Sequence, residues 1–241
     1  MTFIHRASKS HRRRLMGSYE SMILATGPIA CWPQSETSGS VAHCLVNPAQ
    51  NGTYTGVTLA NDLTGPFGTP APYYDGNNDY CNIDTAALVA AFNTDVGTAA
   101  IWTKVNAAGV WSDGIQRQAW TVYGNVQNRM WNAKRAVANN TQTYHEGSNV
   151  GTVIANAGHS ETAWTLWTMT WNTGGNLIAY INGQQDGAPA AGVTAWSSPI
   201  TTAYIGSHTG APTSVWHGWL GPLIFWDRVL PPAEIESLYV S

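Results

Sequence analysis

Charged residues are scarce in this sequence of 241 residues. They make up 10% of the chain, whereas an average soluble protein contains roughly 25%. Coiled coils are rich in charged residues and disordered proteins are poor in apolar ones, so a composition with 44% apolar residues excludes both classes. The length and the apolar content instead suit one large all-β domain or two small domains.

Long apolar runs and paired cysteines are also missing. The longest apolar stretches, residues 86–92 and 219–226, are far shorter than the roughly 20 residues that span a bilayer, so we expect no membrane-spanning helix. Cys31, Cys44 and Cys81 form no C-x-x-C motif and have no histidine at metal-ligand spacing, which predicts reduced, packed thiols. The N-terminal region has no apolar core of a secretory signal, which predicts an intracellular origin.

Positive charge is concentrated at the N-terminus. The first 14 residues contain no acid, and the rest of the chain combines 6 basic with 14 acidic residues, a net charge of −8. A basic arm on an acidic body is typical of a tail that docks on an acidic protein surface or on nucleic acid, and the alternative is a solvated tail. We expect residues 1–18 to anchor a single domain, residues 19–241, whose own charge disfavours nucleic acid. The proposed anchoring residues are Arg6, Lys9, Arg12, Arg13 and Arg14.

Residues 27–226 alternate short β-branched or aromatic runs with clusters of Gly, Asn, Asp, Thr and Pro. This spacing predicts an antiparallel sandwich or barrel, because no segment of helical periodicity separates the runs. The clearest predicted strands are residues 29–32, 73–74, 80–83, 98–104, 118–123, 129–131, 142–145, 165–171, 177–181, 203–205 and 218–226.

The sequence also contains signals for turns and short helices beside the predicted strands. Residues 172–176 and the pair Asn182-Gly183 predict two hairpins, because both supply residues that adopt positive φ easily. Residues 75–79 (DGNND) predict a third turn between two tyrosine-containing runs. Short helices are expected at residues 19–26, which Gly-Pro ends, and at residues 231–239, which Pro-Pro opens.

Three blocks of the sequence resemble a known family. The first, ILATGPIACWPQSETSG (residues 23–39), is similar to G-P-x-A-x-W followed by E-x-S-G. The second, YYDGNNDYCNI (residues 73–83), is similar to an F-D-G-x-x-D-Y-V hairpin. The third combines WTLWTMTWN and LIAYING with GWLGPLIFWDRVLPPAEIESLY, which ends at residue 239. Together they resemble the laminin-G-like members of the concanavalin A-like lectin/glucanase superfamily over residues 19–239.

The resemblance implies a jelly-roll sandwich of two curved antiparallel sheets, with the concave face as the usual glycan site. The chain departs from the family where members commonly carry an Asp-Glu pair in the closing strand and this sequence has Gly221-Pro222. Pro222 cannot donate a ladder hydrogen bond, which predicts an edge position or a bulge. Residues 106–162 match no pattern of the family, so we expect this segment to differ most from other members.

Hydrolytic members of the superfamily carry acids at alternate positions of one strand, E-x-D-x-E, because period two places them on one face. No predicted strand shows this pattern. Glu234 and Glu236 have the spacing but lie in a predicted helix, where it turns them apart. A hydrolase would have to recruit Asp113, Glu146 or Glu161 from the middle region.

Two histidine-containing segments carry residue types that are used in catalysis. Residues 206–210 (GSHTG) place a histidine where the G-x-S-x-G motif requires serine, which favours a turn after a strand. His145 and Glu146 are adjacent on a predicted strand, so their side chains are expected on opposite faces. Neither segment predicts an active site.

Calcium is the best-motivated metal, because Asp75, Asn77 and Asp79 alternate along a turn and offer oxygen ligands. The alternative, which we favour, is a tight turn that these side chains stabilise by Asx hydrogen bonds. A calcium site needs about 6–8 oxygen ligands, and only three side chains are visible here. No other cofactor is expected.

The 12 tryptophans are the most unusual feature of the composition. Most lie in predicted strands, where core packing explains them. Four lie beside polar residues or glycine in expected loops, where a ring together with amide and hydroxyl groups suits stacking on a sugar or anchoring a protein partner. These candidate glycan- or partner-binding residues are Trp111, Trp131, Trp196 and Trp216.

Together these features predict a non-enzymatic structural and binding protein. The basic arm, the low charge and the missing secretory signal favour a virion component made in the host cytoplasm, such as a capsid decoration or tail protein of a phage. A larger capsid or tail assembly would then be the partner of the arm, with a glycan as a further ligand. A free carbohydrate-binding lectin module is the alternative, and a glycan hydrolase is a third.

Overall fold

The computed structural model defines most of the chain after the predicted arm. The predicted anchoring residues in the arm lie outside the described part of the chain. No helix in this described part is long and apolar enough to cross a membrane. The structure describes residues 19–137, 139–148, 150–154, 158–210 and 212–240.

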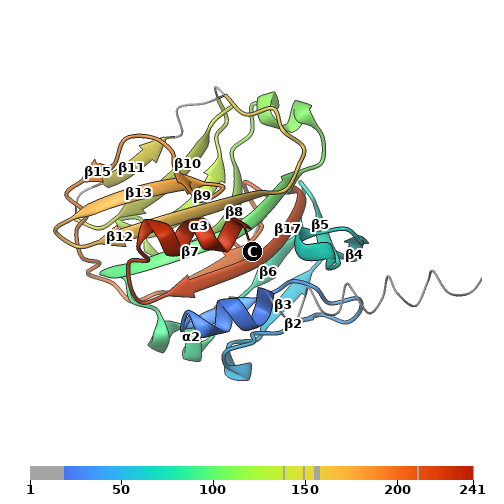
Figure 1. The fold of residues 1–241 in the computed structure, drawn as a ribbon, viewed down its shortest axis with the longest axis horizontal. Coiled ribbons are helices and arrows are strands. Elements are labelled where there is room, and N and C mark those ends of the chain that lie inside the picture. The colour runs from blue at the N-terminus through green and yellow to red at the C-terminus, as the bar shows by residue number, and fades with distance from the viewer. Residues whose placement is uncertain (1–18, 138, 149, 155–157, 211, 241) are drawn as a thin grey trace, which may run out of the picture.

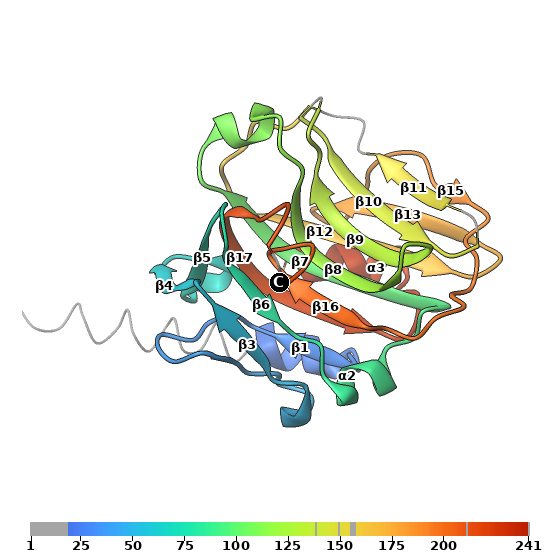
Figure 2. The same ribbon diagram turned by 180° about the vertical axis from the view of Figure 1, so that it is seen from behind.

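Two antiparallel sheets pack face to face (Figures 1 and 2). The first has nine strands among the described residues: β1 (Ala30–Trp32), β4 (Thr58–Asp62), β5 (Ala71–Asp75), β7 (Val96–Val105), β12 (Thr165–Asn172), β13 (Asn176–Ile181), β14 (Gln184–Gln185), β15 (Ala190–Ala191) and β17 (His217–Trp226). They follow the order β14-β13-β12-β7-β17-β5-β4, with β1 paired to β17 and β15 paired to β13.

The second sheet has eight strands among the residues that the structure describes. They are β2 (Val41–Ala42), β3 (Gly52–Thr55), β6 (Tyr80–Asn82), β8 (Arg117–Asn125), β9 (Asn128–Lys134), β10 (Thr141–Glu146), β11 (Val150–Ile154) and β16 (Thr202–Ile205). Their order is β11-β10-β9-β8-β16-β6-β3-β2. The predicted all-β, two-sheet jelly-roll sandwich is confirmed.

The main core lies between the sheets and is unusually aromatic. Trp32, Trp120, Trp167 and Phe225 are buried in it. Alternation along the strands explains their placement, because every second side chain of a strand points to the same face. On β16, for example, Ala203 and Ile205 are in the core whereas the intervening tyrosine is not. The sequence pattern of short β-branched and aromatic runs thus specifies the inner face of each sheet.

Both predicted hairpins are confirmed. The β12–β13 pairing brackets residues 173–175, and the β13–β14 pairing places Ile181 opposite Gln184 across a two-residue turn. In that turn Asn182 has φ 51° and Gly183 has φ 82°. Two consecutive positive φ angles are what a two-residue hairpin matching the strand twist requires, so the Asn-Gly pair specifies this turn locally.

The third predicted turn connects the two sheets and is not a hairpin. β5 ends at Asp75 and pairs with β17 and β4, whereas β6 begins at Tyr80 and pairs with β16 and β3. Residues 75–79 therefore form a corner between layers. The hairpin expected from the family pattern is wrong here, because turn chemistry fixes the reversal of the chain but not the sheet that the next strand joins.

Pro222 lies in a bulge of the central strand β17, as its missing N–H predicts. The register of β17 against β7 shifts between Leu220 and Leu223. At the bulge the carbonyl of Gly221 accepts a hydrogen bond from the buried side chain of Gln34. The proline thus interrupts the ladder, and the amide of Gln34 supplies a hydrogen bond to a carbonyl at the interruption.

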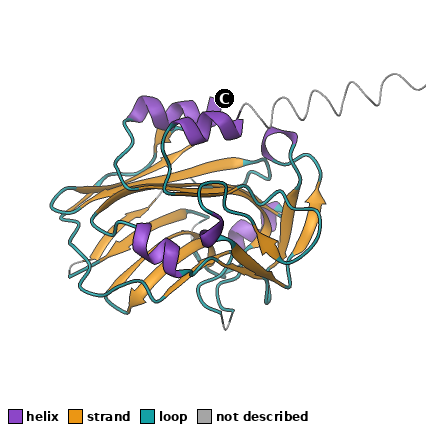
Figure 3. Ribbon diagram, turned by 90° about the horizontal axis from the view of Figure 1, so that it is seen from below, coloured by secondary structure: helices purple, strands orange, loops and turns teal. Residues whose placement is uncertain are grey.

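Helices cover part of the outer face of the nine-stranded sheet (Figure 3). The two predicted helices are confirmed as residues 19–25 and as α3 (Pro232–Val240). They pack on the sheet through a second apolar cluster that includes Ile23, Trp102 and Ile235. A short helix that the sequence reading missed, α2 (Ala86–Ala91), follows β6 and is capped by the side chain of Thr85.

Three short 3-10 helices complete the described structure: η1 (Pro48–Gln50), η2 (Pro66–Gly68) and η3 (Ala108–Ser112). The three cysteines are buried and free, as predicted.

Candidate functional site

The outer face of the eight-stranded sheet gathers aromatic and polar side chains on β8, β9, β10 and β16. These strands lie side by side in Figure 2. Their inward positions carry core residues such as Val122, Met130 and Ala203. The register then aligns two rows of outward positions across the strands. One row is Tyr144, Trp131, Thr121 and Tyr204, and the next is Glu146, Arg129, Tyr123 and Thr202.

The Trp131 and Tyr144 rings are stacked in the first row. Their centroids lie 4.0 Å apart and their planes differ by 12°. Arg129 from the next row lies over both rings, with its guanidinium carbon 5.3 Å from the Trp131 centroid and 5.5 Å from that of Tyr144. The exposed fractions of Trp131 and Tyr144 are 6% and 9%. The rings therefore form a rigid base for the polar groups beside them.

A carboxylate connects the polar groups of this cluster. Glu146 Oε2 accepts hydrogen bonds from Arg129 Nε at 2.6 Å and from the Tyr144 hydroxyl at 2.7 Å. Burial, together with the Glu146 carboxylate, raises the pKa of Tyr144, so its hydroxyl stays protonated and remains a donor. The arrangement fixes a guanidinium, a carboxylate and a phenol at the edge of the ring stack.

His208 completes the cluster from the loop that follows β16. Its ring centroid lies 5.9 Å from that of Tyr123 and 6.0 Å from that of Trp131. Burial and the nearby charge of Arg129 lower the pKa of His208, so the ring is neutral near pH 7. The sequence reading assigned this residue to a turn only. No local signal places it against β8 and β9.

Two ring nitrogens of the cluster lack hydrogen-bond partners among the described residues. They are Nε1 of Trp131 and Nε2 of His208, and both are buried. A buried donor without a partner costs free energy that a ligand hydroxyl or a water molecule can recover. Both nitrogens are closed to solvent, so the groups of the cluster that can hydrogen-bond a polyhydroxylated ligand directly are the partly exposed side chains of Arg129 and Glu146.

The four predicted binding tryptophans do not come together. Trp131 lies on the outer face described above. Trp196 is partly buried against the main core, 6.3 Å from the ring of His145. The expected loop exposure is wrong for Trp131, which lies in β9 and is 6% exposed. It is also wrong for Trp111 and Trp216, which are buried in the core cluster with exposed fractions of 3% and 1%.

Packing partners explain the burial of these two rings. Trp111 donates from Nε1 to the Glu161 carbonyl at 2.9 Å and stacks on His159 at 4.8 Å. Trp216 donates to the carbonyl of Lys104 at 3.4 Å and meets Trp167 edge to face. Both rings fill the end of the sandwich, because their polar chain neighbours lie at the surface while the rings turn inward.

The three acids that a hydrolase would recruit all have basic side chains as partners. Glu146 pairs with Arg129, and Glu161 accepts from His159 Nδ1 at 2.6 Å. Asp113 contacts two cations, Arg117 at 2.7 Å and the fully buried ammonium of Lys134.

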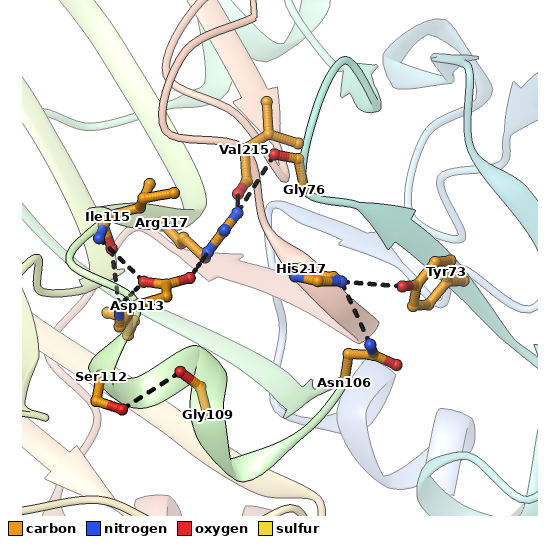
Figure 4. A network of polar contacts seen from close by, with 11 residues as sticks. Tyr73, Gly76, Asn106, Gly109, Ser112, Asp113, Ile115, Arg117, Val215 and His217 are labelled. Carbon is orange, nitrogen blue, oxygen red and sulfur yellow. Dashed lines mark hydrogen bonds and ion pairs between the residues drawn. The ribbon is translucent and has the colours of Figure 1, made fainter.

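The Asp113 network ties loops together at one end of the sandwich (Figure 4). Burial alone would raise the pKa of Asp113, but hydrogen bonds from Lys134 and Arg117 lower it. Arg117 also donates to the carbonyls of Val215 at 2.8 Å and Gly76 at 3.3 Å. These contacts join η3, the corner after β5 and the segment before β17.

The predicted calcium ligands are used within their own turn. Asp75 Oδ1 accepts from the backbone N–H groups of Asn77 at 2.8 Å and Asn78 at 3.3 Å. Asp79 Oδ2 accepts from the N–H of Asp75 at 2.8 Å. The contacts of Asp75 are the Asx hydrogen bonds of the favoured alternative, and Asp79 closes the turn from its other end. The described part of the chain contains no group of three or more His, Cys, Asp or Glu side chains placed to hold a metal ion. Calcium binding by Asp75, Asn77 and Asp79 stays a prediction.

A two-sheet sandwich with an aromatic and polar outer face defines a protein of the lectin-like jelly-roll class. Residues 75–236 match the family described as the concanavalin A-like lectin/glucanases superfamily, and the chain belongs to this superfamily. A comparison with curated protein sequences finds no match.

Solved structures share the fold at low sequence identity. Domain 4 of AbnA, a GH43 extracellular arabinanase from Geobacillus stearothermophilus, was solved with arabinotriose; it has a TM-score of 0.68 and 12% identity over 88% of this chain and 98% of that domain. Trypanosoma rangeli sialidase in complex with sialic acid has a TM-score of 0.68 and 11% identity over 100% of this chain and 39% of that one.

The receptor-binding domain of botulinum neurotoxin mosaic serotype C/D is a third similar structure. Its TM-score is 0.66 at 12% identity, over 88% of this chain and 50% of that one. The chain thus spans the whole arabinanase domain but half or less of the toxin and sialidase chains. At these identities the likeness concerns the fold.

Proposed function

We propose that the protein binds a glycan on the outer face of its eight-stranded sheet, at the cluster of Arg129, Trp131, Tyr144, Glu146 and His208. The observation that carries this proposal is the stacked pair of rings beneath a partly exposed guanidinium that a carboxylate holds in place. Sugars are recognised by such combinations of aromatic rings and hydrogen-bonding groups. The arabinanase domain that shares the fold was solved with arabinotriose, which supports a glycan as the ligand.

Binding without hydrolysis is part of the proposal. Glycoside hydrolysis generally needs two carboxyl groups about 5–9.5 Å apart across the scissile bond. The strands β8, β9, β10 and β16 together contain a single carboxylate, Glu146, and it is paired with Arg129. A lone carboxylate supplies only one of the two carboxyl groups that this chemistry needs, and Arg129 already binds it.

Display on a larger assembly is the second element of the proposal. The first 14 residues carry five bases and no acid, whereas the remainder has a net charge of −8. This asymmetry supports a role for residues 1–18 in anchoring the domain to a capsid or tail of a phage particle, which would present the glycan site to the outside. A free lectin module is the alternative, in which the arm has no partner.

A binding comparison tests the glycan site. The probe is the glycan that binds the wild type most tightly on an array. We expect Tyr144→Phe, which keeps the ring stack but removes the hydroxyl that donates to Glu146, to weaken binding of this glycan about tenfold. Tyr180→Phe is the matched control, because Tyr180 is buried on the outer side of the other sheet. A glycan array with arabinotriose among its probes, followed by calorimetry, measures both. Equal affinity of the two variants and the wild type would overturn this assignment of the site.

A further inference from the structure

The outer face of the nine-stranded sheet has an end that the helices do not cover. The apolar cluster beneath residues 19–25 and α3 includes Trp102 of β7 and Ile224 of β17. Lys104 follows Trp102 on the same face of β7, and Trp219 lies on this face of β17 beyond the bulge; neither belongs to that cluster. Both are partly exposed.

Four side chains form a row across this end of the sheet. The register places Trp219 opposite Lys104 on one side and opposite Tyr73 on the other. Trp164 directly precedes Thr165, which pairs with Thr103 of β7, so it extends the row beyond Lys104. All four side chains are partly exposed. We call this row of Trp164, Lys104, Trp219 and Tyr73 the Trp219 strip.

Ring and cation contacts order the strip. The ammonium of Lys104 lies 4.7 Å from the Trp219 ring centroid and 5.9 Å from that of Trp164. The Tyr73 ring lies 5.1 Å from Trp219 and is tilted by 57°. Because each ring is held by its neighbour, little side-chain entropy is left to lose when a ligand binds.

Polar groups flank the rings. Trp219 donates from Nε1 to Oδ1 of the exposed Asn61 at 2.9 Å. His217 Nε2 lies 3.1 Å from the Tyr73 hydroxyl and 3.3 Å from Nδ2 of the exposed Asn106 (Figure 4). At the other end of the strip, the buried Nε1 of Trp164 has no hydrogen-bond partner among the described residues.

The charges of the strip cancel. Lys104 and Asp62 form an ion pair at 2.7 Å, with side-chain exposures of 25% and 9%. Burial, together with the positive charge of Arg117, lowers the pKa of His217, so this ring is neutral near pH 7. The strip thus offers aromatic faces and hydrogen-bonding groups with no excess charge. This favours an uncharged polyhydroxylated ligand over an acidic or a basic one.

We propose that the Trp219 strip is a second binding site, for a neutral oligosaccharide that lies across the strands. Three intervals between neighbouring strands give the row a length of about 14 Å, which suits an extended oligosaccharide better than a single sugar. C–H faces of the sugars pack on Trp219 and Tyr73, while Asn61 and Asn106 hydrogen-bond hydroxyl groups. The Trp219 strip and the proposed glycan site around Trp131 lie on different sheets, so a single chain would hold two independent glycan sites.

Tryptophan side-chain N–H signals in NMR spectra of the full chain give a direct test. The Trp219 signal is assigned as the one lost in Trp219→Phe. The probes are hexamers of β-1,4-linked glucose, β-1,4-linked xylose and α-1,5-linked arabinose, with a sulfated oligosaccharide as the charged comparison. We expect at least one neutral hexamer to shift the Trp219 signal. In calorimetric titrations with that hexamer, we expect Trp219→Ala or, if that variant fails to fold, Asn61→Ala to weaken binding at least about tenfold.

The control variant is Tyr144→Phe, which alters the other site. Oligosaccharide binding at the Trp219 strip should be the same in Tyr144→Phe as in the wild type. The two sites can therefore be tested separately: failure of the proposed site around Trp131 would not contradict the Trp219 strip, and failure of the strip would not contradict the proposed site. No shift of the Trp219 signal by any neutral hexamer at millimolar concentration would overturn the proposal. A shift produced only by the sulfated probe would overturn it as well, because the strip would then select charge.

Discussion

Arg129 and Glu146 lie directly opposite each other on β9 and β10, and their side chains meet at 2.6 Å on the outer face of the sheet. The same guanidinium lies over the stacked rings of Trp131 and Tyr144. The ion pair therefore does two things: it neutralises a partly buried charge, and it positions a cation on an aromatic surface. Removing one partner leaves the other without compensation.

We expect Glu146→Gln to lower the free energy of unfolding by about 1–2 kcal/mol, because Arg129 loses a charged partner and Tyr144 loses its acceptor. Urea unfolding measures the difference. The matched control is Glu234→Gln, which removes the partner of Arg228 from an ion pair whose side chains are 41% and 39% exposed. Exposed pairs contribute little, so this change should cost less than about 0.5 kcal/mol. Equal effects of the two substitutions would contradict the special role of Glu146.

Absence of polysaccharide hydrolysis is the second expected outcome. Glu146 and Asp113 are in ion pairs and Glu161 contacts the ring of His159, and only Glu146 lies on the aromatic outer face. A reducing-sugar assay against β-glucan, xylan and arabinan should give no signal above the blank. Turnover that disappears in Glu146→Gln or Glu161→Gln would show that the protein is a hydrolase.

The stability should fall in mild acid because of His145. This side chain points inward with an exposed fraction of 0%, while Glu146 beside it points outward, as alternation predicts. Burial lowers the pKa of His145 from its ordinary value of 6.5. The unfolded chain therefore binds more protons than the folded one below about pH 6.5, and stability is lost as pH falls through this window.

Thermal unfolding at pH 7.5 and pH 5.0 measures this effect. We expect the drop in melting temperature to be smaller in His145→Gln than in the wild type. His208 and His217, whose pKa values are also lowered by burial, act in the same direction. Asp113 affects stability in a different pH range. Its pKa is lowered in the folded state, so its contribution to the free energy of unfolding is lost only below about pH 4. An unchanged pH dependence in His145→Gln would contradict the assignment.

Local physics explains which parts of the fold were predictable. Asn182-Gly183 specifies its hairpin because positive φ is inexpensive for these residues, and Pro222 specifies a bulge because it lacks an N–H. The corner at residues 75–79 was misassigned to a hairpin because β5 and β6 find partners far along the chain. No signal within the turn encodes those partners.

The binding face was predictable only in part for the same reason. Trp111 and Trp131 both have polar neighbours in the sequence, yet the first is in the core and the second lies on the outer face. Trp111 turns inward from the 3-10 helix η3, whereas strand register sets the outward direction of Trp131 on β9. His208 reaches the cluster because its loop folds back over β8 and β9. That contact depends on tertiary structure, which the composition of the loop does not reveal.

The last prediction concerns the proposed anchoring role of the N-terminal arm. Deletion of residues 2–14 should leave the sandwich folded, because the first helix that packs on the sheet contributes Tyr19 and Ile23 to the apolar cluster. Attachment to the native particle should fall, since the deletion removes five bases and no acid. Attachment of the full-length protein should also weaken as salt rises, because exposed charges are screened over about 10 Å at 0.1 M.

Co-sedimentation with the particle separates anchoring from the alternative of a free lectin module. The control is a variant in which the five bases of the arm are replaced by glutamine, which keeps its length and its apolar residues. If charge carries the anchoring, this variant should attach as poorly as the deletion, whereas its glycan binding should match that of the full-length protein. Equal attachment of all three proteins would remove the anchoring role, because neither the charge nor the arm itself would then contribute. The glycan site would in that case act in a free module.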